Sequence, residues 1–401
     1  MGHFIWTSAM VPPSRRTRFR RSLTHFTLRA TLYGSWVLGL FPFTFDSGKK
    51  QLHRSRWLLA YGVILNIGLL ILSLLPVTDD HNMIKEEVFA RNPLVKQVEF
   101  LVEIISLAST VIIHLRTFWR SKELVTILNE LLRMERRHFR RLTLGDCIEF
   151  DRNVIYKGLI IVLEIGSSLV IYFGIPDSKV VLREAFCIYL VQLEVLLVVM
   201  HFHLAVIYVY RFVWIINRQL LSLANQLRSS KRVDPDEVLL LLQLYSRLVE
   251  LNDHIASIYD VQMILLMTTL VSANITIGYV LVIMLINSNR FSILVVIIFF
   301  PQALIINFWD LWQGIATCNL AESTGRKTST ILKLFNDIRG MEKELEQRIT
   351  QFTLFCNHRR LRYRHCGLFS INNEIGFQMV VTNILYVLFL VQFDYMNLKY
   401  E

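Results

Sequence analysis

The run VQMILLMTTLVSANITIGYVLVIMLIN, residues 261–287, contains no acidic, basic or histidine side chain. A transmembrane helix needs about 20 mostly apolar residues to cross a hydrocarbon core about 30 Å thick, so this run is long enough to span a bilayer. Of all 401 residues, 53% are hydrophobic, and the mean hydropathy is +0.43. A soluble core of this size cannot bury that much apolar surface, so the composition predicts an all-α, polytopic membrane protein.

Six further segments share this apolar character and are separated by charged connections. The stretch 32–45 is too short to span and is broken by Gly39 and Pro42, so we expect an interfacial or re-entrant piece there. Its aromatic anchors are Trp36, Phe41, Phe43 and Phe45. The seven predicted transmembrane helices are 57–77, 94–115, 154–174, 186–210, 261–287, 291–313 and 374–394.

Connections rich and poor in lysine and arginine alternate along the chain. From the N-terminus to the C-terminus, the segments outside the predicted spans hold 10, 2, 9, 2, 6, 1, 10 and 1 basic residues. Basic segments stay in the cytoplasm during insertion, so we expect the N-terminus inside the cell and the C-terminus outside. G-protein-coupled receptors have the opposite orientation, which disfavours a metabotropic seven-helix receptor.

Amphipathic helices are predicted to extend some transmembrane helices into the cytoplasm. Apolar residues at three- and four-residue spacing continue through 211–260, where Pro235 follows Asp234 as at the start of a helix. Such amphipathic extensions pack either within one subunit or between subunits, and the pattern does not decide between them. The spans and the alternation of basic segments together divide the chain into five parts. They are a cytoplasmic N-terminal segment (1–56), transmembrane helices 1–6 with cytoplasmic extensions (57–315), cytoplasmic helices forming an anchor region (316–373), transmembrane helix 7 as a pore candidate (374–394) and an extracellular tail (395–401).

Catalytic and cofactor motifs are missing from the sequence. It contains no HExxH, GxSxG, GxGxxG or Walker A pattern and no CxxC pair. His201 and His203 are two residues apart on a predicted helix and therefore point in different directions, so they are a poor metal pair. The basic residues that produce the net charge of +11 are separated by long apolar runs, which is typical of the cytoplasmic face of a membrane protein. We therefore expect no enzyme activity, no cofactor, no metal and no nucleic-acid partner.

Acidic residues inside the predicted spans are candidate functional groups, because a charge at mid-bilayer costs about 2.5–3.5 kcal/mol on insertion scales. Asp310 is predicted to be an interfacial anchor or one member of a buried ion pair. A proton or ion relay through Glu99, Glu103 and Glu164 would suit a secondary transporter, which is another alternative. The acids within the spans are Glu99, Glu103, Glu164, Glu194 and Asp310.

Polar and aromatic side chains also gather in the outer halves of the third to sixth spans. A few convergent polar groups among aromatic rings suit a small organic ligand. Ordinary hydrogen bonding between helices explains any single one of them equally well. The candidate ligand-binding residues are Glu164, Ser168, Tyr172, Tyr189, Gln192, Tyr279 and Gln302.

The last predicted span ends with LYVLFLVQF, residues 385–393, in which Gln392 is polar near the outer surface. This end resembles the C-terminal signature of insect gustatory receptors, where Thr-Tyr is followed by five apolar residues and Gln-Phe. Tyr386, Gln392 and Phe393 match the signature, and Leu385 departs from it at the threonine position. Further resemblance to fruit-fly members extends from about residue 30 to 396. It includes LYGSW (32–36), PFTF (42–45), MHFH (200–203), PQ (301–302), NFWD (307–310) and CGLFSIN (366–372).

The resemblance implies a tastant-gated, non-selective cation channel, assembled as a homo- or heterotetramer with other gustatory receptor subunits. Gln392 would face the pore and Leu385, Leu388 and Phe389 would form an apolar gate that closes by dewetting. The implied location is the plasma membrane of gustatory sensory neurons, at the dendrite, and bitter compounds are favoured as ligands. The implied pore and gate residues are Leu385, Tyr386, Leu388, Phe389, Gln392, Phe393 and Asp394, with Asp79, Asp80, Glu86 and Glu87 adding negative potential outside.

Overall fold

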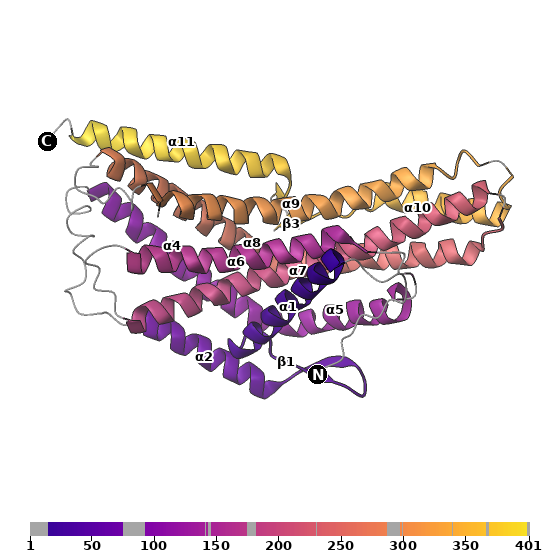
Figure 1. Ribbon diagram of the computed structural model, residues 1–401, viewed down its shortest axis with the longest axis horizontal. Coiled ribbons are helices and arrows are strands. Elements are labelled where there is room, and N and C mark those ends of the chain that lie inside the picture. Colours follow the sequence, from indigo (N-terminus) through magenta and orange to yellow (C-terminus); the bar gives the residue numbers. More distant parts are fainter. Residues whose placement is uncertain are drawn as a thin grey trace.

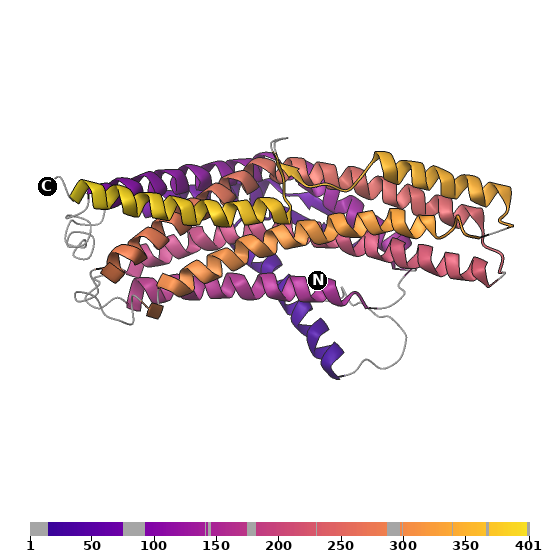
Figure 2. The ribbon, with the colours of Figure 1, turned by 90° about the horizontal axis from the view of Figure 1, so that it is seen from above.

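The computed structural model describes residues 15–74, 93–140, 142, 146–174, 182–229, 231–286, 297–298, 300–338, 340–365 and 369–398. The elements in these ranges are mostly long helices that lie side by side (Figures 1 and 2). The helices are α1 (Arg15–Val37), α2 (Arg56–Leu74), α4 (Pro93–Trp119), α5 (Ser121–Met134), the π-helical turn η2 (Glu135–Phe139), α6 (Ile148–Gly174), α7 (Leu182–Arg228), α8 (Pro235–Ile286), α9 (Phe300–Lys333), α10 (Lys343–His358) and α11 (Asn373–Leu398).

Five of the described helices are long and apolar enough to cross a membrane, namely α4, α6, α7, α8 and α11. A shorter apolar helix, α2, covers most of the predicted span 57–77. The predicted span 291–313 coincides with α9 from Phe300 onward, and most of 291–299 lies outside the described residues. Each predicted span therefore falls on a helix wherever the structure describes it, which confirms the all-α membrane class.

The helices α7 and α8 are about twice as long as a bilayer requires, with 47 and 52 residues. Figure 1 shows their far ends beside α10, away from the C-terminus. The first turn of α8 begins at Pro235, and the Asp234 carboxylate accepts a hydrogen bond from the N–H of Asp236 (3.0 Å), as expected of an N-cap. The predicted helical continuation through 211–260 is thus observed, with a break at 229–234.

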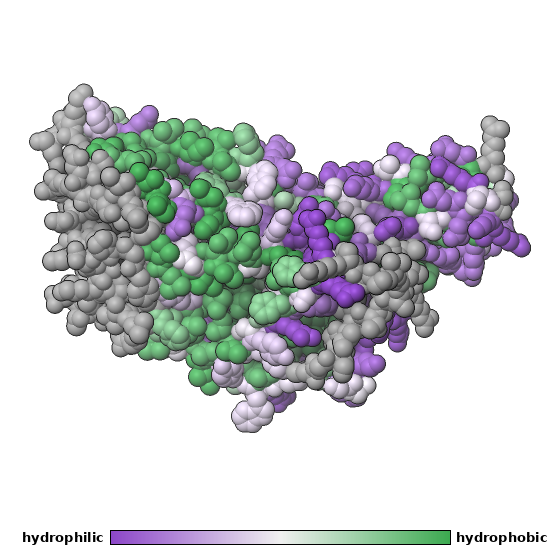
Figure 3. Space-filling model, in the orientation of Figure 1, coloured by the Kyte–Doolittle hydropathy of each residue, from purple (hydrophilic) through white to green (hydrophobic). Residues whose placement is uncertain are grey.

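These extensions pack within the chain. The apolar face of α10 buries Leu345, Ile349 and Phe352, and the ring of Phe352 lies 5.6 Å from that of Tyr245 on α8. Packing within one subunit therefore occupies that face. The space-filling view divides the surface in two: hydrophobic side chains gather over the end that holds α11, and hydrophilic ones over the end that holds α10 (Figure 3).

The N-terminal region differs from the expectation of one short piece at 32–45. A helix, α1, occupies 15–37, and a two-stranded antiparallel hairpin follows it. Between them, Gly39 has φ +70, and a Cβ there would lie 2.3 Å from the Cα of Gly62 on α2. Glycine at both positions lets this turn pack directly on α2. The hairpin strands are β1 (Phe43–Asp46) and β2 (Gln51–Arg54), and a second short hairpin pairs β3 (Arg364–His365) with β4 (Phe369–Ser370).

Candidate functional site

The last helix, α11, packs along only one of its sides. On that side a Cβ on Gly376 would lie 2.9 Å from the side chain of Ile315 of α9, and Val387 contacts Gly278 of α8. Asn383 is buried on the same side. These positions are separated by four to seven residues, the repeat of one helical face. On the opposite side of α11, most side chains are exposed, with no cover from the residues that the structure describes.

The predicted pore and gate residues occupy the uncovered side. Leu385 and Leu388 are 59% and 52% exposed, and Gln392, seven and four residues after them on the same helical face, is exposed as well. Phe389 is 59% exposed, and its ring stacks on that of Phe393, with centroids 6.3 Å apart. Tyr386 is also exposed, whereas the side chain of Asp394 and the acids at 79, 80, 86 and 87 lie outside the described residues.

Part of the predicted ligand set forms a polar layer between α6 and α7. The Gln192 amide of α7 donates a hydrogen bond to the Ser168 hydroxyl of α6 (3.0 Å), and this hydroxyl donates to the Glu164 carbonyl (3.0 Å). The Glu164 side chain is buried, and its Oε2 atom has no hydrogen-bond partner among the described residues. The same holds for the Ser167 hydroxyl. This residue was not predicted, because the sequence does not show which of the adjacent serines 167 and 168 lacks a partner.

The other predicted ligand residues lie elsewhere or are only partly described. Tyr279 is fully buried in a small cluster with Val280 and Met284, against which Leu390 and Val391 of α11 pack. The cluster that contains Tyr279 therefore packs against the pore candidate. Of the three remaining predicted residues, Tyr189 and Gln302 are half-buried, and the side chain of Tyr172 lies outside the described residues.

Comparison with known proteins assigns the family. A family model described as 7tm chemosensory receptor matches residues 28–397. The chain is 66% identical to putative gustatory receptor 22a of Drosophila melanogaster over 98% of its own length and 100% of that protein. It is 46% identical to the gustatory receptor for bitter taste 22e of the same species, over 95% and 98% of the two chains. This chain belongs to the insect gustatory receptor family.

The fold of this gustatory receptor also has a solved counterpart. The structure of the insect olfactory receptor OR5 from Machilis hrabei, determined alone and in complex with eugenol, aligns with a TM-score of 0.63. The alignment covers 93% of this chain and 99% of that one at 12% identity. At this identity the likeness concerns the fold alone, and it confirms a seven-helix, all-α membrane protein.

A buried ion pair joins α6 to α9 inside the receptor. Lys157 and Asp310 pair directly, with side chains 1% and 4% exposed. Sequence reasoning proposed an ion pair for Asp310 but did not notice Lys157, the basic residue inside the third predicted span. The signal was present, because an acid in an apolar span requires a partner of opposite charge or a route to water.

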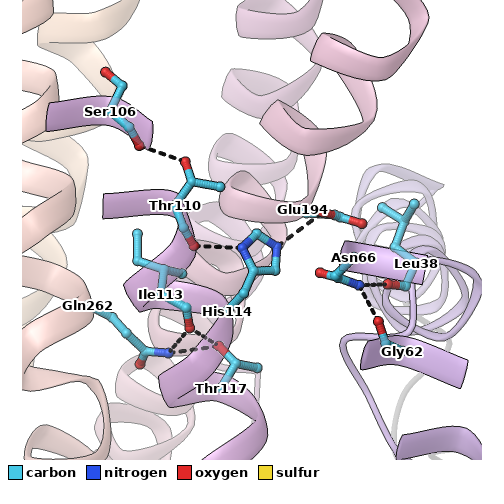
Figure 4. Close-up of polar contacts among 10 residues, drawn as sticks. All are labelled: Leu38, Gly62, Asn66, Ser106, Thr110, Ile113, His114, Thr117, Glu194 and Gln262. Carbon is cyan, nitrogen blue, oxygen red and sulfur yellow. Dashed lines mark hydrogen bonds and ion pairs between the residues drawn. The ribbon is translucent and has the colours of Figure 1, made fainter. Parts of the chain in front are cut away.

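A second polar contact joins α4 to α7 (Figure 4). His114 Nδ1 lies 2.7 Å from the carbonyl oxygen of Thr110, which can only accept, so Nδ1 carries a proton. Nε2 of the same ring lies 3.0 Å from the buried Glu194 carboxyl. That contact holds one further proton, on either the imidazole or the carboxyl group. Glu194 is therefore a helix-pairing residue, with Gln262 making a neighbouring link from α8 to Thr117 (2.8 Å).

Proposed function

We propose that this gustatory receptor is a subunit of a tastant-gated, non-selective cation channel in the plasma membrane of gustatory neurons, with α11 of each of four subunits lining the pore. The uncovered side of α11 carries the proposal, because Gln392 lies on it among apolar residues. An amide facing lipid would lack hydrogen-bond partners, whereas a water-filled axis between four copies would supply them. Leu385, Leu388 and Phe389 would form the gate below it.

Acidic residues would favour cation entry at the outer mouth of this pore. Asp394 follows Gln392 closely in the sequence, and four copies would form a ring there, with Asp79, Asp80, Glu86 and Glu87 adding negative potential around it. Tyr386 and Phe393 would flank the lining residues and pack between neighbouring copies of α11.

The test is whole-cell recording from cells that express the receptor, alone and with other gustatory receptor subunits, against a tastant panel. Gln392→Ala is expected to change single-channel conductance or relative cation permeability. Thr268→Val, an exposed polar residue on α8 that bonds only within its own helix, serves as the control. Ligand-responsive cells that carry no current, with Gln392→Ala indistinguishable from the control, would refute the channel.

The ligand would bind in the polar layer, where Glu164 and Ser167 hold buried atoms that have no hydrogen-bond partner among the described residues. Bitter compounds are favoured because a relative at 46% identity is named a receptor for bitter taste. If this site is correct, Glu164→Gln or Ser167→Ala shifts the tastant concentration for half-maximal response without changing conductance. Unchanged dose-response curves for both variants would move the site elsewhere.

The proposed orientation places the N-terminus in the cytoplasm, and it separates the channel from a metabotropic receptor. An epitope tag at the C-terminus should be accessible to antibody on intact cells, and one at the N-terminus only after permeabilisation. The reverse pattern would favour the metabotropic alternative. The transporter alternative needs broken helices, but α4, α6, α7 and α8 each run unbroken between their ends, and Glu103 is exposed while Glu164 is buried.

A further inference from the structure

The segment between α10 and α11 exposes four arginines. Leu361 and Tyr363 are 3% and 0% exposed, whereas the alternating residues between and around them are exposed. Backbone contacts fix this arrangement, since the Asn252 amide donates to the Arg362 carbonyl (3.2 Å) and Glu322 accepts from the N–H of Tyr363 (3.0 Å). The outward residues of this segment, here called the arginine segment, are Arg359, Arg360, Arg362 and Arg364.

These arginines line a groove of about 750 Å³ against α8. The opposite wall includes two acids, Asp253 and Asp260, and His358 lies at one end. Arg116 from α4 already pairs with Asp260 (2.5 Å). Burial raises the pKa of the Asp253 carboxyl, against the opposing effect of Arg359. The acids of the groove therefore leave most of its positive charge uncompensated.

None of the four guanidinium groups forms an ion pair or side-chain hydrogen bond with the residues that the structure describes, although Glu322 lies close enough to interact electrostatically with two of them. Guanidinium groups bind phosphate oxygens in pairs of parallel hydrogen bonds. Four of them around one groove, more than a single phosphate can use, fit a ligand with several phosphate groups.

The position of the groove identifies the source of these phosphates. The strand β3, which ends the arginine segment, lies beside the start of α11 (Figure 1). A Cβ on Gly376, in the first turn of α11, would lie 3.2 Å from the Trp312 ring of α9, and Trp309 and Trp312 are 42% and 43% exposed. Half-exposed tryptophans mark the headgroup level of a bilayer. The arginine segment thus lies at that level, on the side proposed to be cytoplasmic.

We propose that the groove between α8 and the arginine segment binds the polyphosphorylated headgroup of an inositol lipid from the inner leaflet. The leaflet, but not the phosphate chemistry, rests on the orientation in the proposed function. Because the arginine segment connects α10 to α11, a bound headgroup holds the beginning of the pore helix against α8. Occupancy of the groove then sets how readily α11 moves.

Binding is tested on purified full-length receptor with phosphatidylcholine vesicles, with and without phosphatidylinositol 4,5-bisphosphate. Arg360→Gln combined with Arg362→Gln should weaken binding to the bisphosphate vesicles by about tenfold or more. The matched control is Lys231→Gln with Arg232→Gln, which removes two exposed charges at the α7–α8 turn, far from the groove. Both double variants change exposed side chains, and an unchanged elution profile in size-exclusion chromatography verifies folding.

Equal loss of binding in the two double variants, or no loss in either, overturns the site. Soluble inositol trisphosphate that binds as tightly as the lipid vesicles overturns the lipid assignment and leaves a soluble polyphosphate as the ligand. Arg362→Lys keeps the charge but not the paired hydrogen bonds, so it should retain only part of the affinity. Since none of these measurements needs a current, failure of the channel proposal and failure of this one give different results.

Discussion

Lys157 and Asp310 show how a single pair of residues decides whether charge can remain inside this bundle. Each side chain is almost fully buried, one on α6 and one on α9. Removing one partner of such a pair leaves the other charge without compensation, at a cost of about 3–5 kcal/mol, whereas replacing both with apolar residues is often neutral. The pair therefore adds little net stability of its own, but neither residue can be replaced alone without a large loss of stability.

We expect Asp310→Asn to lower the stability of the receptor by about 3–5 kcal/mol, because Lys157 loses its counter-charge. The double variant Lys157→Met with Asp310→Leu should recover most of this loss. The measurement is the thermal melting of detergent-solubilised, fluorescently tagged receptor, and Glu103→Gln, which neutralises an exposed acid, is the control. A double variant no more stable than Asp310→Asn would show that packing, rather than charge, holds α6 to α9.

At Glu194, we expect the hydrogen bond to His114 to contribute more to the stability of the receptor than the negative charge of the carboxylate does. Its carboxyl group faces His114 Nε2 at 3.0 Å, while the other ring nitrogen is fixed by Thr110. Glu194→Gln supplies an amide N–H that can donate to Nε2 of the neutral ring and should cost little, whereas Glu194→Leu leaves a buried nitrogen unpaired and should cost about 1–3 kcal/mol. Melting of both variants, with His114→Leu to complete a double-mutant cycle, tests this. Equal losses for glutamine and leucine would favour a charged pair.

At the scale of elements, the contact between α8 and α11 determines how closely the pore candidate can approach the bundle. A Cβ on Gly278 would lie 3.0 Å from a Val387 methyl group, whereas a Cβ on Gly68 of α2 would have no atom of the described residues within 4 Å. Overpacking costs about 1–3 kcal/mol in a dense interface. Here the other side of α11 is not packed against described residues of the chain, so displacement of the helix relieves the strain.

Gly278→Val is accordingly expected to shift the tastant dose-response curve or to raise the current without ligand, because it pushes α11 away from α8. Gly68→Val is the matched control and should leave both unchanged. Recording of basal and evoked currents in the same cells makes the comparison. Similar responses for both variants would mean that the contact at Gly278 does not influence gating.

Elements also differ in how well they can be predicted from their sequence. The spans were predictable because twenty apolar residues have few alternatives to a transmembrane helix. Helix α1 was not, because its buried positions are Thr24, Thr31 and Ser35, whereas Phe19 and Phe26 are about 70% exposed. The buried hydroxyl groups bond to carbonyls four residues earlier, which removes their need for water. A pattern search that expects apolar residues inside misses such a helix.

The candidate site likewise has features that could be predicted from the sequence and features that could not. Leu385, Leu388 and Gln392 share one face by helical repeat alone, so their common exposure could be predicted from spacing. The separation of Tyr279 from Gln192 and Ser168 could not, because it depends on which helices pack together. No local pattern in the sequence shows that the α8 cluster of Tyr279, Val280 and Met284 packs against α11 while α6 and α7 meet through Gln192.

On the scale of the whole molecule, the uncovered side of α11 requires either lipid or other copies of the chain. Cysteine replacement distinguishes these, since α11 has no cysteine of its own. If four copies meet along α11, Gln392→Cys should form dimers linked by a disulfide under mild oxidation, visible as a doubled mass on non-reducing gels. Val387→Cys, on the side that contacts Gly278, should remain monomeric. Lipid on the uncovered side would leave both variants monomeric, and it would remove the physical basis for a pore at Gln392, because four helices that never meet cannot enclose water.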